Sequence, residues 1–145
     1  MKTRIGILLS LVVMIMGTAV YGQGKVYKDG SIWQVTFVKT SSNMSDDYLT
    51  SLKTSWKAVG DEAIKQGLII SYKVLQGGAA NPNDWDIMLM TEFKNLGAME
   101  GQDAKWDAIE KKVLGGDDNM KKLNESRVSI RTIYGEKLLR EVVYN

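Results

Sequence analysis

The residue types that most often carry enzyme chemistry are absent from this chain, which contains no histidine and no cysteine. Histidine is the usual proton carrier near neutral pH and a common ligand of zinc and haem. Cysteine supplies thiolate nucleophiles and the remaining zinc ligands. The composition therefore argues against thiol catalysis and His/Cys zinc sites, and we expect no metal and no cofactor.

Three acidic residues have a spacing that would suit a cation. Glu100, Asp103 and Asp107 are three and four residues apart, so they would share one face of a helix. Carboxylates in such an array can hold a hard cation. A solvated helix face, with Asp107 and Lys111 as an ordinary i,i+4 pair, explains the same spacing more simply.

Aromatic and methionine side chains are the stronger chemical signal. The chain has four tryptophans and six tyrosines, and core packing accounts for most of them. Tryptophan and tyrosine together with methionine also suit a pocket for a flat apolar compound, with polar groups to orient it. The candidate pocket residues are Trp56, Tyr72, Met88, Met90, Arg131 and Asn43. No catalytic residue can be assigned from the sequence.

The first 22 residues have the three-part layout of a secretory signal peptide. A basic head (1–4) precedes an apolar core (5–16) and a tail of small residues (17–22). The core is shorter than the roughly 20 residues that span a bilayer. We expect cleavage after Gly22, or alternatively after Ala19. The protein would then be exported by a bacterium, periplasmic or secreted, with no stable membrane anchor, and residues 23–145 would form a single domain.

Charge is balanced once the signal peptide is removed. The 19 basic and 17 acidic residues become 17 of each, because Lys2 and Arg4 leave with it. A neutral domain with interspersed charges has no electrostatic footprint for nucleic acid, so we expect no nucleic-acid partner.

The elements that must position these side chains form a near repeat. Trp33 opens an alternating apolar run and Trp56 follows in a helix-like stretch, and Trp85 and Trp106 repeat that order. The pattern predicts strands at 31–39, 68–75, 85–93 and 136–144. It predicts one helix of roughly 20 residues from Ser45 to Gly67, a second that carries Trp106, and an added helix at 117–134. Residues 23–30 read as a loose lead-in.

The third predicted strand is apolar on both faces, through Ile87, Met88, Leu89 and Met90. Helices cover only one face of an open antiparallel sheet, and a solvated second face normally alternates with polar residues. The simplest cover for the second face is the same sheet of another copy, which would give a two-fold homodimer. The alternative cover is the helix predicted at 117–134.

Four stretches of the sequence carry a family likeness, namely GLIISYKVL at 67–75, WDIMLM at 85–90, WDAIE at 106–110, and Arg140-Glu141. Through them, residues 31–144 resemble the dimeric α/β-barrel superfamily, and above all its small exported bacterial members of unassigned function. It implies an α+β, ferredoxin-like βαββαβ fold with a four-stranded antiparallel sheet, an extra helix before the last strand, and sheet-to-sheet pairing into a dimeric barrel. It also implies a pocket between sheet and helices.

Three functional hypotheses follow. The first is a non-catalytic or small-molecule-binding homodimer that takes a small apolar or aromatic ligand. The second is a cofactor-independent monooxygenase or isomerase acting on such a compound, and the third is a purely structural dimer with a filled core.

Overall fold

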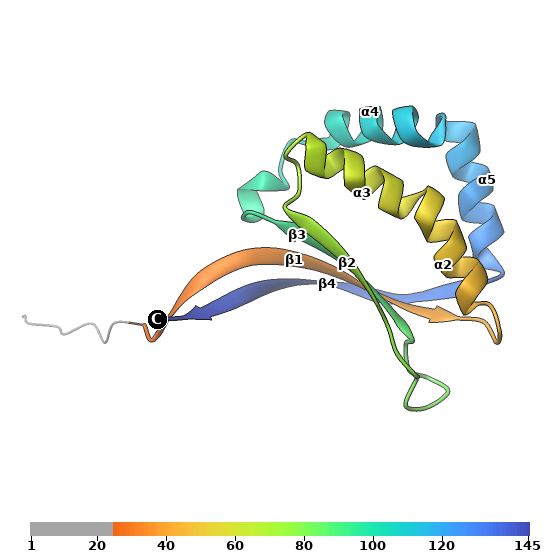
Figure 1. Cartoon of the computed structure of the whole chain (residues 1–145), viewed down its shortest axis with the longest axis horizontal. Helices are drawn as coiled ribbons and strands as arrows, with labels where there is room; N and C mark the ends of the chain where they lie inside the picture. Colours follow the sequence, from red (N-terminus) through yellow and green to blue (C-terminus); the bar gives the residue numbers. More distant parts are fainter. Residues whose placement is uncertain (1–24) are drawn as a thin grey trace, which may run out of the picture.

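A computed structural model describes residues 25–145 as a layer of helices over one antiparallel sheet (Figure 1). The predicted signal peptide and its cleavage site lie outside these residues. Along the chain the elements are β1 (Tyr27–Thr40), α2 (Ser45–Thr54), α3 (Trp56–Lys65), β2 (Ser71–Gln76), β3 (Ile87–Phe93), the 3₁₀ turn η1 (Leu96–Ala98), α4 (Asp103–Leu114), α5 (Asp117–Val128) and β4 (Arg131–Tyr144).

The strand order is β2-β3-β1-β4, and every neighbouring pair is antiparallel. β1 and β3 are central, and each strand–helix–strand unit places its second strand at an edge. This is the ferredoxin-like arrangement, with α5 added before the last strand, and it confirms the predicted fold class. In the single chain the sheet is open, with β2 and β4 as its edges, and does not close into a barrel.

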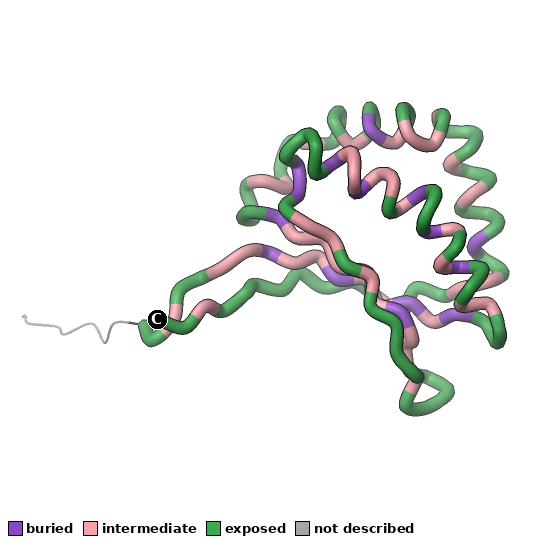
Figure 2. Tube along the Cα trace, viewed as in Figure 1, coloured by how far each residue is buried: buried purple, intermediate pink, exposed green. Residues whose placement is uncertain are grey.

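Buried residues occur in both the helices and the strands, as the purple stretches of Figure 2 show, and they form two clusters between the two layers. One cluster lies beneath α3 and α4 and comprises Ile32, Ala63, Leu68, Ile69, Phe93 and Ile109. The other lies beneath α2 and comprises Val38, Tyr48, Leu52, Ile87 and Leu89. The predicted apolar stripe of the first helical region therefore does face the sheet.

The predicted single helix from Ser45 to Gly67 is wrong, because the helix is interrupted at Ser55 and divided into α2 and α3. The Ser55 backbone leaves the helical region (φ −125°, ψ −88°), and its hydroxyl donates to the Ser51 carbonyl at 2.5 Å. The buried Arg127 from α5 fills this break by donating to the Ser51 and Ser55 hydroxyls. Gly67 does end the helical region in a left-handed conformation (φ 69°), as predicted.

The predicted helix at 117–134 is too long, since α5 ends at Val128 and the last strand starts at Arg131. Tyr134 lies in β4, and Gly135 (φ 151°) lies at the register shift opposite Phe37 and Val38. α5 packs on the helix side of the sheet (Figure 1). The alternative in which this helix covers the second sheet face is therefore wrong.

β1 begins earlier than predicted, so the lead-in at 27–30 is strand rather than loop. Tyr27 pairs with Tyr144, and the β1–β4 ribbon continues beyond Ile32, where β3 pairing starts with Phe93. Arg140 bonds Asp29 across this ribbon at 2.5 Å. In Figure 1 the ribbon projects past the helix layer. β2 and β3 begin three and two residues later than predicted, at Ser71 and Ile87.

Within residues 25–145, no helix has both the length and the apolar character needed to cross a membrane.

Candidate functional site

The two faces of the sheet differ in their cover. Ile87 and Leu89 of β3 belong to the cluster under α2. Because strand side chains alternate, Met88 and Met90 point away from the helices. Paired residues of antiparallel strands share a face, so the partners of Met88 and Met90 lie there too. We call this side the outer face, defined by Trp33, Val35, Phe37, Leu75, Met88, Met90 and Leu139.

On the helix side, a cleft of about 320 Å³ opens between the sheet, α3 and α4. Its floor comes from the central strands, through Gln34, Thr91 and Phe93. Its walls are largely aromatic and apolar, and they comprise Trp56, Val59, Gly60, Ile69, Tyr72, Met99 and Trp106. A concave, mostly apolar site with a few polar groups is the usual form of a small-molecule site.

Gly60 sets how closely α3 approaches the sheet. A Cβ atom at this position would lie 2.7 Å from Cδ1 of Tyr72, a separation that requires the ring or the helix to move. The Tyr72 ring also meets Trp56 edge-on, with centroids 5.2 Å apart and planes at 81°. The close contact between α3 and the sheet therefore explains why a glycine stands inside this helix. The same contact forms one wall of the cleft.

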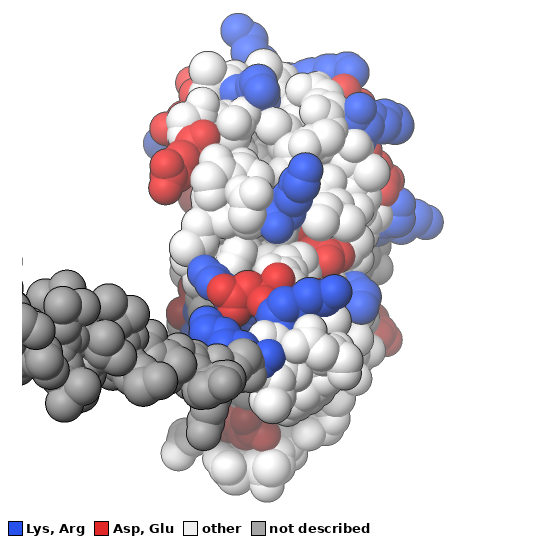
Figure 3. Space-filling model, turned by 90° about the vertical axis from the view of Figure 1, so that its left-hand side faces the viewer, with Lys and Arg blue, Asp and Glu red and all other residues white. Residues whose placement is uncertain are grey.

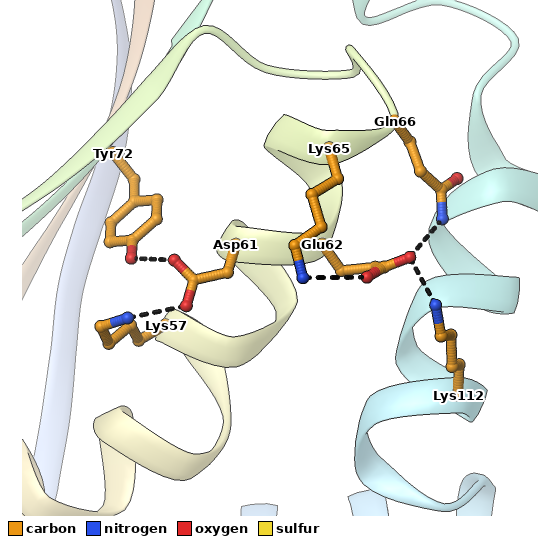
Figure 4. Close-up of polar contacts among 7 residues, drawn as sticks. All are labelled: Lys57, Asp61, Glu62, Lys65, Gln66, Tyr72 and Lys112. Carbon is orange, nitrogen blue, oxygen red and sulfur yellow. Dashed lines mark hydrogen bonds and ion pairs between the residues drawn. The ribbon is translucent and has the colours of Figure 1, made fainter.

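Polar contacts hold this wall from outside (Figure 4). The Tyr72 hydroxyl donates to Asp61 Oδ1 at 2.5 Å, and Lys57 Nζ bonds Asp61 Oδ2 at 2.7 Å. The hydrogen bond from Lys57 holds the pKa of Asp61 below its ordinary value. Burial, followed by the bond to Asp61, raises the pKa of Tyr72. The Tyr72 hydroxyl is therefore already hydrogen-bonded to a residue of α3.

A second set of contacts ties α3 to α4. Glu62 accepts from Lys112 at 2.7 Å and from Gln66 at 3.1 Å, and it lies 3.8 Å from Lys65 (Figure 4). The hydrogen bond from Lys112 lowers the pKa of Glu62. The two helices that form the cleft walls are thus joined by an ion pair.

Two further carboxylates, Asp103 and Glu110 of α4, line the cleft itself. Burial, and then the charge of Asp107, raises the pKa of Glu110. Within residues 25–145 the Glu110 side chain forms no hydrogen bond or ion pair. The sequence pattern grouped Asp103 with Glu100 and Asp107, as a cation site or a solvated helix face, and did not single out Glu110. The i, i+3, i+7 spacing of Asp103, Trp106 and Glu110 could have pointed to their shared face.

The structure brings together two of the six predicted pocket residues, Trp56 and Tyr72, in this cleft. Met88 and Met90 lie on the outer face, on the other side of the sheet. Arg131 and Asn43 lie near the start of α2. Arg131 stands 5.8 Å from the Tyr48 ring centre, and Asn43 adopts a positive φ of 62° in the turn before the helix.

Arg127 is a buried charged residue that the sequence pattern did not reveal. It is 8% exposed, and its guanidinium lies 6.0 Å from the Tyr48 ring centre. Burial lowers the pKa of Arg127. Its bonds to Ser51 and Ser55 place the charge at the carboxyl end of α2, where the helix dipole favours a cation. We therefore infer that Arg127 has a structural role, which is to stabilise the break between α2 and α3.

Another hollow lies outside the cleft. A groove of about 590 Å³ between α4 and α5 is lined mainly by charged side chains of both signs, including Asp107, Lys111 and Lys121. Over the described part of the chain, no three acidic side chains are grouped to hold a metal ion. Basic and acidic side chains are also interspersed on the end of the molecule shown in Figure 3.

The sequence matches no protein-family model and no curated protein. The structure is similar to HapK from Hahella chejuensis (10% identity, 76% of this chain and 91% of that one, TM-score 0.44). It is also similar to a dimeric ferredoxin-like protein from an uncultured marine organism (17%, 81% and 90%, TM-score 0.48). A third is a dimeric protein of unknown function with a ferredoxin-like fold from Bacteroides fragilis NCTC 9343 (13%, 82% and 99%, TM-score 0.39).

Proposed function

We propose that this protein is an exported homodimer that binds a small, largely apolar or aromatic molecule in the cleft between the sheet and α3/α4. The observation that carries the proposal is the cleft itself. A core filled by its own side chains would leave no such space, whereas about 320 Å³ stays open beside Trp56, Tyr72 and Trp106. The third hypothesis, a purely structural dimer with a filled core, is therefore the less favoured one.

The cleft is supported on both sides, which favours binding without a large rearrangement. The Gly60–Tyr72 contact fixes the distance from α3 to the sheet, and the Glu62–Lys112 pair links α3 to α4. Binding in a preformed cavity costs the protein less conformational entropy than binding in a cavity that must first be assembled. Gln34 and Thr91 on the floor offer hydrogen bonds that would orient the ligand.

The second copy would cover the outer face. Leu75 of β2 and Leu139 of β4 are 49% and 46% exposed on this face. Met88 and Met90 of the central strand β3 lie between these two edge strands. Two lysines border the patch, with Lys73 5.0 Å from the Trp33 ring and Lys137 5.8 Å from the Phe37 ring. An apolar centre with a charged rim is the usual composition of a protein interface. A two-fold axis would bring the same patch of both copies together.

Binding can be tested with a neutral fluorescent probe such as N-phenyl-1-naphthylamine. Wild-type protein should raise its emission and saturate. The variant Val59→Phe places a ring in the cleft and should weaken binding about tenfold or more, because the ligand loses the space it needs. Ile64→Phe, on the exposed side of α3, is the matched control and should bind like wild type. Equal binding by all three proteins would contradict the cleft as the site.

A further inference from the structure

We propose that the cleft selects a cationic ligand, an apolar or aromatic amine, and that Asp103 and Glu110 supply its counter-charge. This inference rests on the proposed function, since it names the ligand class for the same cleft. It starts from the charge of the lining, which contains these two carboxylates and neither lysine nor arginine.

The two carboxylates bracket an aromatic ring on α4. Asp103, Trp106 and Glu110 are separated by three and four residues, so they lie on one face of the helix. Trp56 and Tyr72 stand in the opposite wall, on α3 and β2. Carboxylates next to the faces and edges of aromatic rings form the arrangement that binds ammonium groups, through Coulomb attraction and cation–π contact.

Glu110 differs from the acidic residues of the neighbouring helix, which already have cationic partners. On α3, Asp61 bonds Lys57 and Glu62 bonds Lys112, each at 2.7 Å. Among the described residues Glu110 has no such bond, and the charge that acts on it most is that of Asp107, which repels it. A cation in the cleft would relieve this repulsion, whereas an anion would add to it.

The shape of the cleft limits the rest of the ligand. A volume of about 320 Å³ is at the small end of ligand sites, which suits a compound of one or two rings. Phe93, Met99 and Ile69 offer apolar contact for such a ring system. The ligand class is therefore an amine with a compact apolar or aromatic body, rather than a sugar, a phosphate ester or a carboxylic acid.

Three probes of similar shape separate charge from size: 2-naphthylmethylamine, 2-naphthylmethanol and 2-naphthoate, titrated by calorimetry at pH 7 and low salt. We expect the amine to bind about tenfold more tightly than the alcohol, and the carboxylate to bind most weakly. Equal affinities for the amine and the alcohol would overturn the charge selection while leaving the proposed function intact. A lack of binding by all three would overturn both.

Variants then assign the preference to residues. The double variant Asp103→Asn/Glu110→Gln should bring the amine and the alcohol to within about twofold of each other, because the counter-charge for the ammonium group is lost. Glu100→Gln removes one charge from an exposed position outside the cleft and should keep the preference. A preference that survives in the double variant would overturn the assignment. Thermal melting by circular dichroism checks that each variant is folded. The titrations of the three probes with wild-type protein test the charge preference even if a variant does not fold.

Discussion

The two faces of β3 carry similar side chains in different surroundings. Ile87 and Leu89 are 0% and 7% exposed under the helices, whereas Met88 and Met90, one residue away, lie on the side that no described helix covers. A solvated sheet face usually carries polar residues, yet this one retains Trp33, Phe37 and two methionines. This difference supports the proposed second copy on the outer face, because the side chains there are as apolar as those that the helices cover.

The largest expected effect comes from placing a charge on each face in turn. Leu89→Lys should destabilise the fold by about 3 kcal/mol or more, because an unpaired ammonium would be buried between sheet and helices. Met90→Lys, the adjacent residue on the outer face, should leave the fold intact but separate the dimer. Urea unfolding and light scattering measure the two effects. The comparison of faces fails if Met90→Lys unfolds the chain as strongly as Leu89→Lys.

A smaller effect should follow from crowding the covered face at the cleft. Gly60→Val would force a side chain into the Tyr72 ring and should lower the free energy of unfolding by about 1–3 kcal/mol. It should also reduce binding of the neutral probe, because the α3 wall must shift. Ala58→Val on the same helix is the control and should cost less. Equal losses of stability and binding in both variants would mean that the Gly60–Tyr72 contact does not fix the position of the α3 wall.

The smallest effect concerns the pH dependence of stability. The raised pKa of Glu110 means that the folded state binds this proton more tightly than the unfolded state does. Its contribution to stability is therefore complete below its ordinary value of 4.5, and it declines as pH rises from there through the raised pKa. Glu110→Gln removes this decline. Plots of the urea midpoint against pH should therefore differ in slope between wild type and variant above pH 4.5. Parallel plots would contradict the burial of this carboxyl.

The sequence predicted those parts of the fold that depend on local pattern. Alternation around Trp33 and the continuous apolar run from Ile87 to Met90 identified the central strands. Gly67 marked a helix end because glycine readily adopts the left-handed conformation found there. The strand order followed from the twofold strand–helix–strand pattern. Trp56 and Tyr72, two of the predicted pocket residues, lie in contact because an apolar stripe of α3 meets the helix-side face of β2.

Other features depend on contacts between distant residues, which a local pattern does not contain. The break at Ser55 depends on Arg127, which lies 72 residues later in the chain. The early start of β4 reflects pairing of Arg131 with Thr40, which overrides the helical spacing of Ile130 and Tyr134. Glu110 was missed because its partial burial arises only when α4 packs over the sheet.

The most direct test of the account is the mass in solution of residues 23–145, measured by size-exclusion chromatography with light scattering at micromolar concentration. A second copy on the outer face predicts twice the mass of one chain, and a mass that falls to that of one chain in Met90→Lys. A wild-type protein that runs as a stable monomer, with its outer face open to water, would contradict the claim that this face is built for a partner copy.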